Sequence, residues 1–309
     1  MAFFSELLKE LSPNQILLQD TALESYATDA SYAVGAKPSA VVFVDKPEQV
    51  QYVLMVANRH RIPVTVRGAG TGKSGGAVPE EGGVVLSLNR LEKRIEVDEK
   101  NRVVTVSAHV VIQELQAAVL KHRLFYPVDP ASLDRCTVGG TIAENAGGPR
   151  ALKYGVTGNY ILGLEGVFGT GAPFKLGGKL HKDVAGYDLK RLLIGSEGTL
   201  AVITAATLKC IVLPQNEWLM WLAFDTVQDA CHFLQACREA RVQPSLAEMM
   251  QGACLRAVEK TIGSRIPFSE REAHVLLGID GGLKQLEESL CSITAVADRW
   301  NEQIQVAKT

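Results

Sequence analysis

The hydrophobic positions near the start of the chain alternate between strand-like and helix-like spacing. Residues 40–44 are apolar and mostly β-branched, which predicts a strand, and Pro47 suits the first turn of a helix. Apolar residues between 50 and 57 then recur on one helical face, and residues 62–66 predict a second strand. The pattern therefore predicts a β-α-β unit whose second strand leads into the glycine-rich stretch "RGAGTGKSGG".

Further strands and one helix are expected downstream. Residues 84–88 predict a strand, residues 94–108 a β-hairpin, and residues 111–123 a helix. The stretch from Phe125 to about Gly158 is predicted to be irregular. Two later apolar segments, "YILGLEGVF" and "TLAVITAATLKCIVL", are again typical of strands.

The pattern changes after Pro214, where strand-like and helix-like segments alternate to the end of the chain. This predicts an α+β fold with three parts. Residues 1–37 form an N-terminal arm that opens with an amphipathic helix, residues 38–214 form the first domain, and residues 215–309 form a second α+β domain. The last strand-like segment is expected to lack sheet partners, which leaves an open edge and favours a shortened chain or an obligate partner.

Composition excludes several classes of protein. The 309 residues carry a net charge of −2, with 47% apolar and 21% charged residues, so no nucleic-acid partner is expected. No apolar run approaches the ~20 residues of a transmembrane helix. The six cysteines form no CxxC pair, which argues against a zinc or iron–sulfur site and fits a reducing cytoplasm.

The stretch from Arg67 to Gly76 nearly fits two phosphate-binding motifs. A P-loop would need glycine at the position of Arg67, and a dinucleotide-binding βαβ motif would need a helix directly after the loop. A strand is predicted there instead. The sequence leaves a strand–loop–strand nest of backbone N–H groups that binds an anion, although the loop alone is equally compatible with a solvated turn.

Two more glycine clusters favour the anion-binding interpretation. Residues 136–148 and residues 193–204 each lie beside a predicted strand. Three separated clusters of this kind suggest one extended ligand that lies across several loops, and a dinucleotide has that shape.

Five motifs in this order resemble the FAD-linked 2-hydroxyacid dehydrogenases, which include the glycolate oxidase catalytic subunit and D-lactate dehydrogenases. The motifs are "RGAGTGKSGG", "PVDPAS", "TVGGTIAENAGGPRALKYG", "LGGKLHKDVAGYDL" and "IGSEGTLAVIT". The resemblance covers residues 20–309. It implies an FAD-binding domain of the vanillyl-alcohol-oxidase (PCMH) type, followed by an incomplete α+β cap domain.

The resemblance also implies a set of FAD-binding residues. They lie in the three glycine clusters and in the segments beside them: Arg67, Gly68, Ala69, Gly70, Thr71, Gly72, Ser74, Pro130, Ser132, Thr137, Gly139, Gly140, Asn145, Gly148, Gly155, Glu197, Gly198 and Ile203. Arg67 is expected to screen the diphosphate. FAD is expected to bind noncovalently, because no histidine or cysteine matches a flavin attachment position.

Several residues depart from the family pattern. Lys73 replaces a leucine and is expected to be solvated, and His181 is expected at the surface. Lys182 and Asp183 are expected to form a structural ion pair. Ala201 stands where the family has glycine, so a positive φ there would strain the flavin site. The histidines show no metal-ligand spacing, and no metal site is predicted.

The implied activity is hydride transfer from C2 of a small 2-hydroxy acid, glycolate or D-lactate, to FAD. The family's catalytic base, metal ligands and carboxylate-binding arginine are expected from a segment beyond Thr309, so the catalytic residues of this chain are unknown. Two alternatives stay open: an FAD-binding subunit or remnant without its own catalytic site, and, less favoured by "DVAGYDL" and "IAENAGG", a peptidoglycan-precursor reductase. An electron-transfer partner subunit or completing chain is expected, and it could attach the protein peripherally to a membrane.

Overall fold

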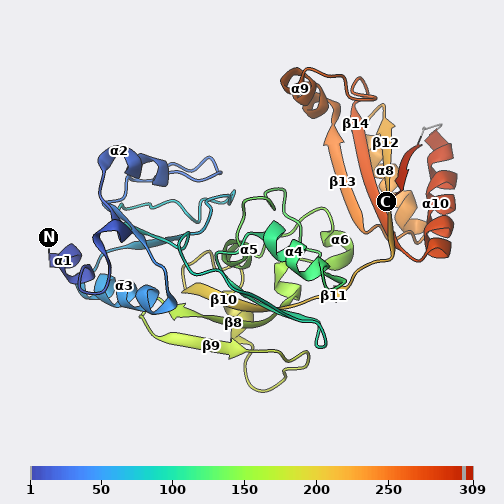
Figure 1. Ribbon diagram of the computed structural model, residues 1–309. Helices are drawn as coiled ribbons and strands as arrows, with labels where there is room; N and C mark the ends of the chain where they lie inside the picture. The colour runs from blue at the N-terminus through green and yellow to red at the C-terminus, as the bar shows by residue number, and fades with distance from the viewer. Residues whose placement is uncertain (1, 301–303, 309) are drawn as a thin grey trace. The chain divides into compact units, whose positions relative to one another are not determined.

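The computed structural model describes residues 2–300 and 304–308. Contacts divide the chain into two compact units (Figure 1). The first comprises Met1–Gly148 and Val156–Val212, and the second comprises Pro149–Gly155 and Leu213–Thr309. Residues 149–155, which the sequence assigned to the first domain, thus group with the second unit.

The first unit begins with a four-stranded sheet in the order β1-β2-β4-β3. The strands are β1 (Ile16–Leu17), β2 (Ala40–Phe43), β3 (Val64–Arg67) and β4 (Val84–Ser87). Both β2 and β3 are parallel to β4, so the predicted β-α-β unit exists with a third strand inserted between its two strands. The glycine loop follows β3 directly, so it leaves the sheet at the carboxyl end of that strand.

Helices α1 (Ala2–Leu7) and α3 (Pro47–His60) pack against this sheet, and the short α2 (Asp20–Leu23) lies between β1 and β2 in the chain. The predicted apolar face of α3 is buried, with Val50 and Val53 fully inaccessible. They share a core cluster with Phe3 and Leu7 of α1. The N-terminal helix is shorter than the apolar pattern suggested, and it is part of the core of this unit.

A five-stranded antiparallel sheet forms the second layer of the unit, in the order β5-β6-β10-β8-β9. Its strands are β5 (Ile95–Asp98), β6 (Val103–Ser107), β8 (Ile161–Phe168), β9 (Pro173–Gly177) and β10 (Ala201–Lys209). The helices α4 (Ile112–Leu120) and α7 (Leu189–Leu193) and the pair β7 (Leu124–Phe125) and β11 (Ile211–Val212) complete the unit. Val167 and Val202 belong to the same core cluster as β2 and β4, so the two sheets share one core.

The prediction of an irregular segment from 125 to 158 is wrong at its centre. Helix α5 (Val138–Glu144) lies there, capped by the Thr137 side chain and ended by Asn145 in the left-handed conformation. Glycine is unfavourable in a helix, which is why the sequence pattern did not predict α5. At Gly139 it is needed for close packing, because a Cβ there would lie 2.7 Å from the Cβ of Ala108. Helix propensity was therefore overridden by tertiary contact.

The second unit is a β-α-β-β-α-β module with one added helix. Its elements are β12 (Asn216–Phe224), α8 (Val227–Glu239), β13 (Leu246–Gln251), α9 (Gly252–Ile262), β14 (Ala273–Gly281), α10 (Leu283–Ala297) and β15 (Ile304–Lys308). The antiparallel sheet order β13-β14-β12-β15 is that of ferredoxin-like folds. The expectation that the last strand lacks a partner is wrong, because β15 pairs with β12.

One face of this sheet packs on α8 and α10, with Phe224 and Phe233 in the core cluster. A polar set ties the segment 149–155 to the sheet. Arg150 forms a two-armed ion pair with Glu217, at 2.6 and 3.0 Å. In the short helix α6 (Ala151–Tyr154), Lys153 and Tyr154 both bind the carboxylate of Asp280.

Over the residues that the structure describes, no helix is both long enough and apolar enough to cross a membrane.

Candidate cofactor site

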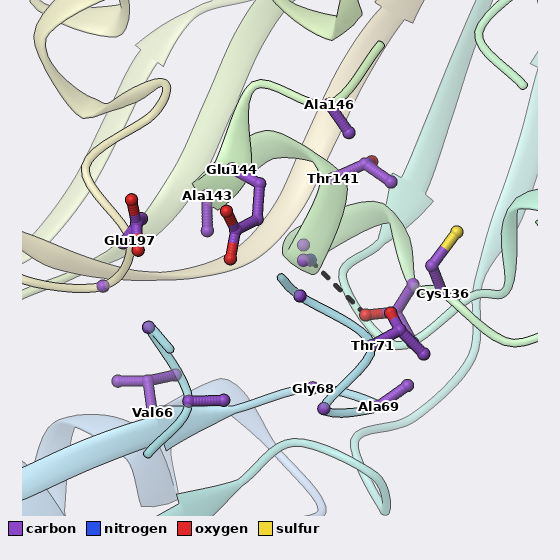
Figure 2. A pocket seen from close by; sticks show the side chains of 18 of the residues that line it. Val66, Gly68, Ala69, Thr71, Cys136, Thr141, Ala143, Glu144, Ala146 and Glu197 are labelled. Carbon is purple, nitrogen blue, oxygen red and sulfur yellow. Dashed lines mark hydrogen bonds between the residues drawn. The ribbon is translucent and has the colours of Figure 1, made fainter. Parts of the chain in front are cut away.

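A cavity of about 530 Å³ opens in the first unit where three distant parts of the chain meet (Figure 2). Its walls come from the glycine loop after β3, from residues 130–146 around α5, and from residues 193–203 at the start of β10. Most of the predicted site residues line it: Gly68, Ala69, Gly70, Thr71, Gly72, Pro130, Ser132, Thr137, Gly139, Gly140, Glu197, Gly198 and Ile203. The three glycine clusters, separated in sequence, thus form one site.

The glycine loop supplies unpaired hydrogen-bond donors. Within the described parts of the chain, the backbone N–H groups from Gly68 to Ala77 donate to no protein acceptor. Gly70 and Gly75 have positive φ, at +67° and +89°, a conformation that glycine adopts without strain. As predicted, the loop is followed by strand β4 and not by a helix. Backbone donors without partners are the feature that an anion-binding nest requires.

The start of α5 differs from the glycine loop, because its backbone N–H groups already donate to acceptors within the protein. Those of Val138 and Gly139 donate to the carbonyls of Val110 and Ala108, and that of Gly140 donates to the Thr137 hydroxyl at 3.4 Å. The helix therefore serves as a wall. A Cβ on Gly68 would lie 2.7 Å from Thr137 Oγ1, so the loop and this wall are in close contact.

Two carboxylates approach the far end of the loop. The Ser74 hydroxyl lies 2.8 Å from Glu144 Oε2 and 3.2 Å from Glu197 Oε2. In Figure 2 both glutamates lie on one side of the cavity, with Gly68, Ala69 and Thr71 on the other. Sequence reasoning found Glu197 but missed Glu144, although "IAENAGG" placed an acidic residue inside a glycine cluster. The Ser74 hydroxyl contacts both carboxylates, but Ser74 does not line the cavity.

Arg67 is positioned differently from the prediction. Its Nη1 donates to the carbonyls of Thr28 and Ala77, at 2.8 and 3.2 Å, and its guanidinium lies 5.3 Å from the centre of the Tyr26 ring. Burial lowers the pKa of Arg67, with Asp29 opposing that shift. The side chain joins the N-terminal segment to the glycine loop and does not line the cavity.

Three other predicted residues also lie outside the cavity lining. Asn145 accepts a hydrogen bond from the Gly158 backbone N–H at 2.8 Å, which fixes the end of α5. Gly148 allows close backbone packing, since its Cβ would lie 2.3 Å from the Asp129 carbonyl oxygen. Gly155 ends α6 with φ +79° and belongs to the second unit. Their direct contact with a cofactor stays a prediction.

The cavity contains residues that sequence reasoning passed over. Lys73 is exposed as expected, but it also lines the cavity and donates to the Ala30 carbonyl at 2.7 Å. Cys136 lies in the wall, and burial raises the pKa of its thiol. The thiol is therefore kept protonated and weakly nucleophilic. Ala30 shows that the N-terminal arm also contributes to the site.

The loop after β9 lies outside this cavity. His181 is exposed, as expected, with its Nε2 2.8 Å from the Asn101 carbonyl oxygen. The predicted pair of Lys182 with Asp183 is wrong, because Asp183 pairs with Lys190 at 3.4 Å. No group of three or more His, Cys, Asp or Glu side chains among the described residues is placed to hold a metal ion.

Ala201 lines the cavity without backbone strain. It begins β10, is 4% exposed, and does not have a positive φ. The expectation that alanine there compromises the site is therefore not supported by the backbone. We expect Ala201→Gly to leave the FAD dissociation constant unchanged within about twofold and to lower the unfolding free energy by about 0.5–1 kcal/mol, because glycine loses more entropy in a strand. Flavin titration and chemical denaturation measure the two effects, and a tenfold gain in affinity would contradict this account.

The residues present fit an extended diphosphate-containing cofactor. The glycine loop offers unpaired donors, and Gly68 approaches the opposite wall so closely that no side chain fits between them. Apolar side chains such as Leu193 and Ile203 complete the lining. Donors at one part and apolar surface at another are what a dinucleotide with a flat ring system needs.

Comparison with known proteins agrees with this geometry. The family described as FAD binding domain matches residues 38–177, and the family described as FAD linked oxidases, C-terminal domain, matches residues 213–309. Glycolate oxidase subunit GlcD of Bacillus subtilis (strain 168) is 35% identical over 285 residues, which cover 92% of this chain and 60% of that protein. D-lactate dehydrogenase of Archaeoglobus fulgidus is 42% identical over 242 residues, which cover 78% of this chain and 54% of that protein. The chain thus spans little more than half the length of these relatives.

Solved structures share the fold. p-Cresol methylhydroxylase with substrate bound superposes with a TM-score of 0.80 at 16% identity, covering 99% of this chain and 65% of that one. Alkyldihydroxyacetonephosphate synthase gives a TM-score of 0.80 at 21% identity, covering 98% of this chain and 60% of that one. The predicted PCMH-type fold is confirmed, and FAD is the cofactor that the matched domains bind. The chain belongs to the FAD-linked oxidases, with an FAD-binding domain followed by the family's C-terminal domain.

Proposed function

We propose that this chain binds FAD noncovalently in the cavity beside the glycine loop and takes part in the oxidation of a small 2-hydroxy acid, glycolate or D-lactate. One observation carries the proposal. Three glycine-containing segments from distant parts of the sequence line one cavity, and the loop among them has a run of N–H groups without protein acceptors.

Electrostatics supports a diphosphate beside the loop. Hydrogen bonds to a charged group contribute about 1.5–3 kcal/mol each, so several loop N–H groups can offset the cost of burying two phosphates. The backbone from Gly68 to Thr71 would hold the diphosphate against the wall formed by Thr137 and α5. Bound there, FAD supplies the acceptor for a hydride taken from C2 of the hydroxy acid.

The substrate class comes from the relatives. Two of them are named glycolate oxidase subunit and D-lactate dehydrogenase, and both match most of this chain. Glycolate and D-lactate share a hydroxyl group next to a carboxylate, so one chemistry serves both. An electron-transfer partner subunit belongs to the same proposal.

The test is an absorption spectrum of the purified chain after incubation with FAD and desalting, followed by anaerobic addition of glycolate or D-lactate. We expect an oxidised-flavin spectrum after desalting, and release of the flavin on acid precipitation because it is not covalently attached. Bleaching by either hydroxy acid supports the oxidation. Succinate, which has no 2-hydroxyl group, is the control and should leave the spectrum unchanged.

The outcomes separate the two parts of the proposal. Retained flavin that no hydroxy acid bleaches would support the alternative of an FAD-binding subunit that does not act alone. A chain that retains no flavin at all would overturn the assignment of the cavity.

A further inference from the structure

The cavity has two electrostatically different ends. Around Gly68 to Thr71 the loop offers N–H donors, which attract anions. At Gly72 and Gly76 the loop faces carboxylates: a Cβ on Gly72 would lie 2.6 Å from Glu144 Oε1, and a Cβ on Gly76 would lie 2.6 Å from Glu197 Oε2. A diphosphate placed between the two glutamates would meet like charge at short range.

The protein supplies too few hydrogen-bond donors for the oxygens of the two carboxylates. Both reach the Ser74 hydroxyl, which carries one hydrogen and can donate to only one of them at a time. Lys73, the basic residue next to Ser74 in the sequence, donates instead to the Ala30 carbonyl. Among the residues that the structure describes, Ser74 is the hydrogen-bond donor to both glutamate side chains. At least one carboxylate therefore faces the cavity with its acceptor oxygens available to a ligand.

We propose that Glu144 and Glu197 together bind the vicinal hydroxyl groups of the ribose in the adenosine half of FAD, and so fix which way the cofactor lies in the cavity. The inference rests on the proposed function. Both carboxylates converge on one serine oxygen, and two adjacent hydroxyls of a ribose can donate one hydrogen bond to each of them. The diphosphate then lies at the Gly68–Thr71 end, and the ribose lies at the Gly72–Gly76 end.

Two other groups of FAD must be distinguished from this ribose. The adenine amine also carries two N–H hydrogens, but it is retained in an analogue that lacks only the ribose hydroxyls, so its contribution to binding would not differ between FAD and that analogue. The ribityl hydroxyls lie on the flavin side of the diphosphate, and their placement here would reverse the cofactor. A reversed cofactor would put its adenine toward the apolar wall at Cys136 and Pro130.

The experiment compares two ligands by flavin fluorescence titration: FAD, and an FAD analogue whose adenosine ribose lacks both hydroxyl groups. We expect the wild-type chain to bind the analogue at least about 100-fold more weakly, because two charge-assisted hydrogen bonds of about 1.5–3 kcal/mol each are lost. Equal affinity for the two ligands would overturn the inference. That result would leave the proposed function intact, whereas failure to bind FAD itself would remove the proposed function.

Variants at the two glutamates test the sign of the interaction. Glu144→Gln and Glu197→Gln are each expected to weaken FAD binding about 5–10-fold and to reduce the discrimination against the analogue, because a neutral amide accepts more weakly than a carboxylate. If the glutamates face the diphosphate instead, removal of their charge will tighten FAD binding, and that outcome also overturns the inference. Glu96→Gln is the matched control: this glutamate of the same unit is half exposed, pairs with Arg94 and lies outside the cavity. It should bind both ligands as the wild type does.

Discussion

Gly68→Ala is expected to weaken FAD binding by about 10–100-fold while the chain stays folded. The added methyl group would lie 2.7 Å from Thr137 Oγ1, a distance that requires movement. Thr137 cannot easily move, because it is 4% exposed and caps α5. The loop must therefore shift, and losing one loop N–H···phosphate hydrogen bond costs about 1.5–3 kcal/mol.

Flavin titration of purified variants measures this effect, and a double-mutant cycle identifies its cause. Thr137→Ala removes the oxygen that the new methyl group meets, so Gly68→Ala should cost less in the Thr137→Ala background than in the wild type. Gly178→Ala is the control, since nothing lies within 4 Å of its added Cβ. Equal costs of Gly68→Ala in both backgrounds would show that this contact does not set the position of the loop.

Asp280→Ala is expected to destabilise the second unit by about 2–4 kcal/mol. The carboxylate is 2% exposed and accepts hydrogen bonds from Lys153 Nζ and from the Tyr154 hydroxyl, the latter at 2.5 Å. Its removal leaves a partly buried ammonium group without its partner. Breaking a buried pair in this way costs about 3–5 kcal/mol, and we expect a somewhat smaller loss of about 2–4 kcal/mol here because Lys153 is 23% exposed and keeps some contact with water.

Chemical denaturation, followed by the fluorescence of the tryptophans at 218, 221 and 300, all in the second unit, measures this loss. Glu288→Ala is the control: this exposed carboxylate lies 3.9 Å from Lys284 on α10, and its loss should change the unfolding free energy by less than about 0.5 kcal/mol. A loss for Asp280→Ala as small as that for Glu288→Ala would show that water reaches Lys153 freely.

Local patterns predicted the elements whose periodicity was regular. The β-α-β unit, the hairpin at residues 94–108 and the helix after it were predicted from apolar spacing. The reason is that α3 and α4 bury apolar residues at helical spacing and β6 is buried along most of its length. Helix α5 could not be found in this way. Its glycines signal a loop, and only the contact of Gly139 with Ala108 shows why a helix carries them.

The same distinction applies to the site. By itself the sequence determined three glycine clusters and, by resemblance, the FAD-binding family to which they belong. Only the tertiary structure brought the clusters to one cavity, assigned Arg67 to the carbonyls of Thr28 and Ala77, and placed Glu144 beside Ser74. The reason is physical. Backbone conformation at a glycine follows from that residue and its neighbours, whereas the partner of a charged side chain depends on which distant segment the folded core brings within hydrogen-bond reach.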